Sequence, residues 1–165
     1  MDTTLINIIQ PALTPVSINV TMPAAQPVLV NVSAVGEKGD PGPTGPSEGS
    51  LNFVIDGGSS VITTGLKGFI EWGFAATITG WTILADQVGD IVVDVWKDNY
   101  GNFAPTVDDT IAGSEKPTLF NTQKNQDLTL TSFSTTVLEG DIWAFNVDSA
   151  SDVNKVTIAF RFNKQ

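Results

Sequence analysis

NKVTIAFRF, residues 154–162, alternates apolar and polar side chains without interruption. Strict period-two alternation is typical of a β-strand that buries one face and exposes the other. The apolar face holds Val156, Ile158, Phe160 and Phe162, and the polar face holds Lys155, Thr157 and Arg161. The sequence therefore predicts a half-buried strand close to the C-terminus.

Seven further stretches are predicted strands, because they are rich in β-branched and aromatic residues and lack a helical period. They are residues 52–55, 60–63, 68–74, 76–84, 90–96, 128–133 and 141–147. Glycine-bearing turns such as 88–90 separate them, and residues 98–126 are predicted to form long loops. The pattern predicts an all-β domain over residues 50–165, an antiparallel β-sandwich of jelly-roll type.

Ahead of this domain, residues 36–49 are dominated by glycine and proline, with glycine at every third position from 36 to 45. Gly36, Gly39, Gly42 and Gly45 open the triplets GEK, GDP, GPT and GPS. Only glycine fits at the crowded axis of a collagen triple helix, and proline holds each chain in the polyproline-II conformation. We therefore predict a short collagen-like stem that joins three copies of the chain.

Charged residues add detail to this stem. Lys38 and Asp40 flank Gly39, a spacing that lets Lys38 of one chain meet Asp40 of its neighbour. Such an exposed pair contributes a few tenths of a kcal/mol, roughly, at each of three positions. The triplet register breaks at Ser47–Glu48, so the stem is expected to end there or soon after.

A glycine- and proline-rich linker in a monomer is the alternative to a trimeric stem. The two interpretations differ in what a methyl group does at a triplet glycine. If the stem is a triple helix, Gly42→Ala is expected to weaken trimer assembly more than Gly113→Ala, which falls in a predicted loop.

Residues 1–35 form a third segment, which carries one charged residue, Asp2, and is rich in Val, Ile, Thr and Pro. Its four prolines exclude a helix through most of its length. Exposing so many aliphatic side chains to water is unfavourable. We therefore expect an extended arm that is ordered against another surface, in preference to a tail without fixed structure.

Composition narrows the function. The chain has 18 acidic and 8 basic residues and no His, which gives a net charge of −10. Binding to nucleic acid or to an anionic membrane needs clustered Lys and Arg, so neither partner is expected. There is no Cys, and the N-terminal MDTTLINIIQP lacks the basic start and apolar core of a signal peptide. We expect assembly in a cytoplasm.

Candidate chemistry is sparse. Without His and Cys, neither a Ser-His-Asp triad nor a thiolate zinc site can be built. Asp108 with Asp109, or Glu139 with Asp141, are the carboxylate pairs that glycoside cleavage would need, but both lie in sequences typical of turns. The oxygen-bearing residues of 98–109 do not follow calcium-loop spacing, although a metal there stays an alternative. No enzymatic activity, cofactor or metal is expected.

Aromatic residues fall into two groups. Trp72, Trp81, Trp96 and Trp143 lie within strand patterns, where core or inter-subunit packing is expected. Tyr100 and Phe103 lie in the predicted loop rich in Asn, Gly and Pro. An exposed aromatic pair on a loop is a candidate contact for a glycan or protein receptor. Folding of the pair back over the sandwich is the alternative.

Three stretches of the β domain resemble a C-terminal domain of fibre and appendage proteins of tailed bacteriophages. They are residues 53–98, residues 99–120 and residues 140–160, with GWTILAD (80–86) and GDIVVDVWKD (89–98) as the most specific part. In that family such domains commonly follow collagen-like triplets. The resemblance implies a trimeric virion protein with a β-sandwich tip, and it carries over no catalytic residues.

The short stem favours a head fibre similar to those of crAss-like phages, because a tail fibre or spike usually has a long shaft that does not fit in 165 residues. We expect residues 1–35 to bind the major capsid protein or another virion protein, and the tip to adhere to the host surface or to glycans. A receptor-binding tail appendage is the alternative. A bacterial surface collagen-like adhesin is a third candidate, which the expected lack of a signal peptide disfavours.

Overall fold

The computed structural model describes residues 6–10, 30–34, 45 and 47–165, which belong to two separate units, Met1–Thr44 and Gly45–Gln165. In the first unit, β1 (Ile6–Gln10) pairs in parallel with β2 (Val30–Ala34). Most of the predicted stem lies outside the described residues, including Gly36, Lys38, Gly39, Asp40 and Gly42. Among the described residues, no helix is long and apolar enough to cross a membrane.

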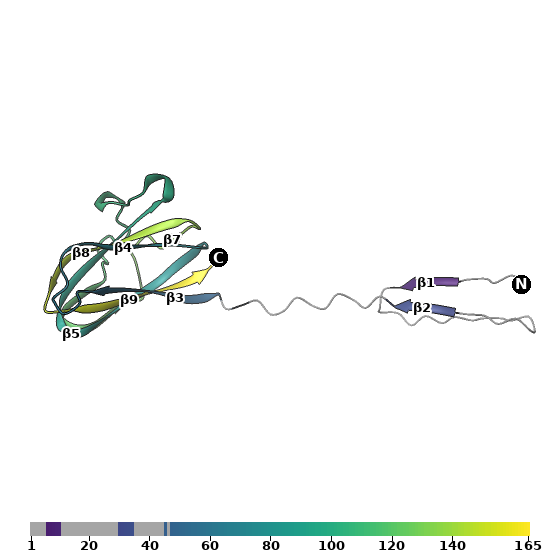
Figure 1. The fold of residues 1–165 in the computed structure, drawn as a ribbon, viewed down its shortest axis with the longest axis horizontal. Helices are drawn as coiled ribbons and strands as arrows, with labels where there is room; N and C mark the ends of the chain where they lie inside the picture. The colour runs from purple at the N-terminus through teal and green to yellow at the C-terminus, as the bar shows by residue number, and fades with distance from the viewer. Residues whose placement is uncertain (1–5, 11–29, 35–44, 46) are drawn as a thin grey trace, which may run out of the picture. The chain divides into compact units, whose positions relative to one another are not determined.

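Seven strands make up the second unit (Figure 1). They are β3 (Glu48–Asp56), β4 (Gly65–Glu71), β5 (Ala76–Asn99), β6 (Thr118–Asp127), β7 (Thr136–Val137), β8 (Asp141–Ser151) and β9 (Lys155–Lys164). Their order in the sheet is β3-β9-β5-β8-β4, with β6 and β7 also paired to β5, and every pairing is antiparallel. The prediction of an all-β, antiparallel domain is confirmed.

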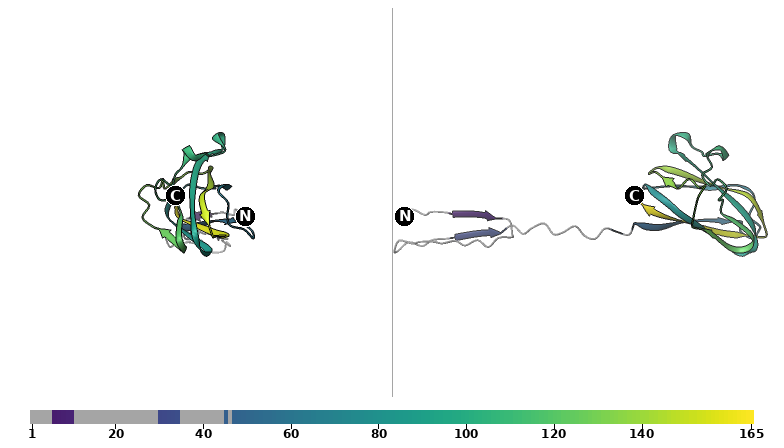
Figure 2. Two further views of the ribbon diagram at one scale, coloured as in Figure 1. Left: turned by 90° about the vertical axis from the view of Figure 1, so that its left-hand side faces the viewer. Right: turned by 180° about the vertical axis from the view of Figure 1, so that it is seen from behind.

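The sheet curls because one long strand belongs to both of its halves (Figure 1, Figure 2). Residues 76–85 of β5 pair with β9, whereas residues 90–99 pair with β8. The prediction of two strands with a turn at 88–90 is wrong. Gly89 does not break the strand; it lets the backbone of Ser151 approach, since a Cβ at Gly89 would lie 2.6 Å from the Ser151 carbonyl oxygen.

Three other local predictions are also wrong. Residues 118–127, predicted as loop, form β6, whose only fully buried residue is Leu119, so that no alternating pattern marks it. Residues 128–133, predicted as a strand, form bends, with Leu130 at a positive φ of 27°. Residues 60–63 are not a strand; their buried member, Ile62, donates a backbone hydrogen bond to Val153.

The core lies between the two halves of the curled sheet. The predicted alternation in β9 is confirmed, since Val156, Ile158 and Phe160 are fully buried. Three of the four tryptophans, Trp72, Trp81 and Trp143, are also buried, which confirms core packing for them. The rings of Phe53 on β3 and Phe145 on β8 stack with centroids 3.9 Å apart. This stacking joins one edge strand to the strand beside the other edge.

Both ends of the described domain meet at one place. The backbone N–H of Lys164, at the end of β9, donates to the carbonyl oxygen of Ser47, just before β3. β3 therefore starts beside the C-terminus and runs away from it over nine residues. Ser47, Glu48 and Lys164 thus lie at the end of the domain where the chain enters it.

Candidate functional site

The predicted contact residues lie in the segment that joins β5 to β6, which projects from the sheet (Figure 1, Figure 2). Tyr100 opens a short 3₁₀ helix, η1 (Tyr100–Asn102), and is 83% exposed. Asn99 caps this turn by accepting from Gly101 N–H at 2.8 Å. Phe103 is 55% exposed, and its ring centroid lies 4.9 Å from that of Phe69 on β4.

The two predicted alternatives for this aromatic pair are exposure to a ligand and folding back over the domain. Tyr100 fits the first alternative, and Phe103 fits the second in part. Tyr100 points into solvent and is free to contact a ligand. Phe103 leans onto the sheet, although half of its surface stays open. The two residues place an aromatic surface beside the end of β5, where the loop leaves the sheet.

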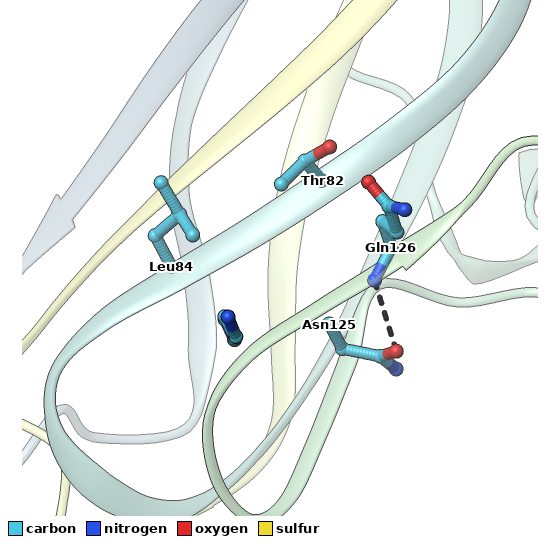
Figure 3. Close-up of a pocket in the computed structure, with 5 residues that line it drawn as sticks. Thr82, Leu84, Asn125 and Gln126 are labelled. Carbon is cyan, nitrogen blue, oxygen red and sulfur yellow. Dashed lines mark hydrogen bonds between the residues drawn. The ribbon is translucent and has the colours of Figure 1, made fainter.

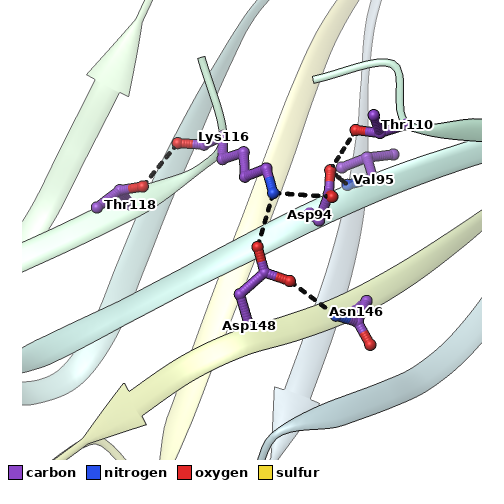
Figure 4. A network of polar contacts seen from close by, with 7 residues as sticks. All are labelled: Asp94, Val95, Thr110, Lys116, Thr118, Asn146 and Asp148. Carbon is purple, nitrogen blue, oxygen red and sulfur yellow. Dashed lines mark hydrogen bonds and ion pairs between the residues drawn. The ribbon is translucent and has the colours of Figure 1, made fainter. Parts of the chain in front are cut away.

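A buried ion pair fastens the base of this loop to the sheet (Figure 4). Asp94 on β5 is 1% exposed and accepts from the Thr110 hydroxyl at 2.6 Å. The ammonium of Lys116 lies 2.9 Å from one oxygen of Asp94 and 2.7 Å from Asp148 on β8. Thr110 and Lys116 both belong to the loop, so this network holds it against the outer face of β5 and β8.

The network keeps its groups charged. Burial acts to raise the pKa of the Asp94 carboxyl, but hydrogen bonds from Thr110 and Lys116 outweigh burial and hold that pKa below its usual value. Burial acts to lower the pKa of Lys116, but Asp148 and Asp94 together raise it. Asp94 is therefore ionised at neutral pH and committed to structure. It has no proton to donate as a general acid.

Glu115 forms a second anchor. Its carboxylate accepts from the hydroxyl and N–H of Thr131, both at 2.6 Å, and from the N–H groups of Ser132 at 2.8 Å and Phe133 at 2.7 Å. Its own carbonyl accepts from the Trp81 indole at 2.9 Å. This carboxylate explains why residues 131–133 bend instead of forming the predicted strand. Their N–H groups turn toward Glu115 and not toward a neighbouring strand.

These bonds predict an acid-sensitive anchor. Hydrogen bonds from Thr131 and its neighbours lower the pKa of Glu115 to about 2. A lowered folded-state pKa means that the stabilisation is complete above the unfolded value, 4.5, and is lost as the pH falls through about 2. We expect Tm to drop over this interval, and Glu115→Gln to lower Tm at pH 7 and to flatten the drop.

Thermal unfolding followed by circular dichroism between pH 7 and pH 2 measures both effects. Glu139→Gln is the matched control, because Glu139 is exposed in a turn and its carboxylate accepts no hydrogen bond from the described residues. If Tm falls by the same amount between pH 7 and pH 2 in Glu115→Gln and in the parent protein, Glu115 is not the acid-sensitive anchor.

In each carboxylate pair considered for glycoside cleavage, one carboxylate accepts a backbone hydrogen bond that stabilises a turn. Asp109 accepts from the N–H of Thr106 at 2.7 Å within η2 (Val107–Asp109). Asp141 accepts from Leu138 N–H at 2.9 Å, and Gly140 beside it has a φ of 84°. Across the described residues, no three acidic side chains converge on a point where they could hold a metal ion.

The outer face of β3, β9, β5 and β6 carries two shallow hollows. The first, of about 350 Å³, is lined by Thr82, Leu84 and residues 124–126 (Figure 3). The second, of about 690 Å³, lies toward Glu48 and includes Arg161 and Thr82. No sequence pattern pointed to this face, because its residues are the ordinary polar side of alternating strands.

Comparison with known proteins does not extend these observations: no protein family matches the chain, and neither a curated protein nor a solved structure is significantly similar to it. The resemblance to phage fibre domains therefore stays a prediction. Function has to be inferred from the residues of the chain itself.

Proposed function

We propose that this chain is a non-enzymatic virion protein, a homotrimeric head fibre of a tailed bacteriophage. In this proposal residues 1–35 bind the major capsid protein or another virion protein, residues 36–47 form a collagen-like triple helix, and the β domain, of jelly-roll type, is the outward tip. The observation that carries the proposal is the run of four glycine triplets, which stops where β3 begins, at Glu48.

Two features of the described domain support this role. The chain reaches the domain at Ser47, beside the end of β9, so a stem can join the domain without crossing it. The loop that carries Tyr100 and Phe103 projects from the sheet with aromatic surface exposed. The net charge of −10 per chain keeps such particles apart in solution.

The oligomeric state tests the proposal first. Light scattering of the purified chain is expected to give three times 17.5 kDa. Antibodies raised against residues 45–165 are then expected to label phage heads in electron micrographs. Labelling of tails would favour the tail appendage, and labelling of bacterial surfaces in the absence of phage would favour the adhesin. A mass of 17.5 kDa would overturn the trimer.

A glycine substitution tests the stem. Gly42→Ala is expected to lower the trimer fraction on dilution and the Tm of the trimer, because a methyl group does not fit at a triple-helix axis. Gly113 is a poor control, since its φ is 54° and a Cβ there would lie 2.8 Å from the Ser132 carbonyl oxygen. Gly73 is the better control, with open space around a Cβ, and Gly73→Ala should change stability by less than about 0.5 kcal/mol. Equal behaviour of Gly42→Ala and Gly73→Ala argues for a linker.

Receptor contact by the loop is a second, compatible function, which the exposure of Tyr100 favours. Tyr100→Ala is expected to reduce binding of the purified chain to bacterial cells or to a glycan array at least tenfold, equivalent to about 1.4 kcal/mol, without changing Tm. Phe120→Ala is the control, because Phe120 is also 83% exposed but lies on β6. Equal losses in the two variants mean that the loop is not the contact.

A further inference from the structure

We propose that three copies of the β domain pack through the outer face of β3, β9, β5 and β6, at the end where the proposed stem joins. The partner of this face is a second copy of the same chain. The inference rests on the trimeric stem of the proposed function and adds to it the surface that the three domains share.

Chain reach restricts which part of the domain lies near the trimer axis. In a triple helix the glycine of each triplet sits at the axis, and Gly45 is the last triplet glycine. Glu48 follows three residues later, and a chain spans at most ~3.6 Å per residue, so its Cα lies within about 11 Å of that axis. The start of β3 and its neighbours in the sheet must therefore come close to their copies.

Strand alternation selects one face of β3. Leu51, Phe53 and Ile55 pack inward, so the residues between them face outward. Across the strands, these outward residues form three rows: Ser50 with Arg161; Asn52 with Ala159, Thr82 and Gln126; and Val54 with Thr157, Leu84 and Lys124. Most of these side chains are small and uncharged, which allows a second backbone to approach closely.

Charge separates this face from the rest of the chain. The three rows, with Glu48 at their edge, carry one carboxylate against two cations, Arg161 and Lys124, and the next row adds only the ion pair of Asp56 with Lys155, whereas the whole chain has a net charge of −10. Like charges across an interface are costly, so three acidic domains are expected to meet where carboxylates are scarce. Neither Glu48 nor Arg161 forms an ion pair within the described part of the chain.

A threefold arrangement lets these two charges meet. In such a ring, one patch of each copy contacts a different patch of the next copy. Glu48 of one copy and Arg161 of the next can therefore pair, although the two residues make no pair within one copy. Arg161 is the only arginine in the sequence, and its guanidinium can bind a carboxylate through two hydrogen bonds.

Within a single copy, this face also leaves hollows unfilled and apolar side chains uncovered. Both hollows described above lie on this face and share Thr82. The Thr82 hydroxyl oxygen is buried and has no hydrogen-bond partner among the residues that the structure describes. Leu84 and Val54, in one row, are 49% and 53% exposed. A second copy seated in these hollows would cover the apolar pair and bring polar groups toward the hydroxyl.

Crosslinking tests the surface, because the chain has no cysteine and single-cysteine variants are unambiguous. Ser50→Cys places a thiol on the proposed face. Ser149→Cys is the matched control, because Ser149 is exposed near the end of β8, in the other half of the sheet. With a short bismaleimide, Ser50→Cys in the full-length chain is expected to give crosslinked dimers in most trimers, at least fivefold more than Ser149→Cys, after denaturing electrophoresis.

Light scattering of the same samples separates the two proposals. A mass of three copies with crosslinking confined to Ser149→Cys, or equal in both variants, overturns the surface and leaves the trimer intact. A mass of one copy overturns the trimeric stem, and the surface with it. As a second variant, Arg161→Glu is expected to reduce crosslinking of Ser50→Cys severalfold, and unchanged crosslinking would contradict the pairing with Glu48.

Discussion

Phe145→Ala is expected to lower the free energy of unfolding by about 3–5 kcal/mol, the usual cost of removing a buried phenylalanine. Phe145 is fully buried on β8, where its ring stacks on Phe53 and lies 6.0 Å from Phe160. Phe53 belongs to edge strand β3, and β8 borders the opposite edge strand, β4. Loss of the ring therefore leaves a cavity between two strands that lie far apart in the order of the sheet.

Urea unfolding at equilibrium measures this loss. Phe120→Ala removes the same atoms from a side chain that is 83% exposed and should change stability by less than about 0.5 kcal/mol. Similar losses in the two variants would mean that Phe145 is not in the core. Since small domains are stable by only about 5–15 kcal/mol, Phe145→Ala should already be partly unfolded at moderate urea concentrations.

Asp94→Asn is expected to destabilise the domain by about 1.5–3 kcal/mol, the range for a buried hydrogen bond to a charged group. The amide removes the negative charge that Lys116 faces at 2.9 Å and places an N–H₂ group among donors. Hydrogen exchange is expected to increase in residues 109–117 before the rest of the domain, because the network anchors the loop.

Asp148→Asn makes the same change at the exposed end of that network. The Asp148 side chain is 33% exposed, and exposed ion pairs contribute at most about 1 kcal/mol. We therefore expect the smaller loss from Asp148→Asn. If it equals or exceeds the loss from Asp94→Asn, the buried carboxylate is not the main anchor of the loop.

The parts of the fold that the sequence predicted are those in which one strand face is buried and the other exposed. β9 is such a strand, and its pattern shows in the residues themselves. The sequence did not predict β6, because only Leu119 of that strand is buried. The pairing of β6 with β5 is therefore not accompanied by an alternation of apolar and polar residues. The continuity of β5 was missed because a glycine looks the same in sequence whether it forms a turn or admits a neighbouring backbone.

The candidate site was predictable to a similar extent. The sequence predicted that Tyr100 and Phe103 lie on a loop but left exposure and folding back as alternatives, and the structure shows that Tyr100 is exposed. The anchors Asp94 and Glu115 were not predicted, because their partners, Thr110, Lys116 and residues 131–133, lie 16 to 22 residues away in the sequence. Likewise, the sequence around Gly113 is that of an ordinary loop, and only its backbone conformation shows that a side chain there is strained.

The hydrogen bond between Lys164 and Ser47 sets how the domain responds to mechanical force. When force is applied to Ser47 along β3 while the projecting loop is held fixed, the nine residue pairs between β3 and β9 are sheared at the same time. A pull between Ser47 and Gln165 instead peels those pairs apart singly, starting from the bond that joins them. Single-molecule stretching between residues 47 and 107 should therefore require a higher rupture force than stretching between residues 47 and 165. A tether that enters the domain along β3 is thus attached in the direction that resists unfolding better.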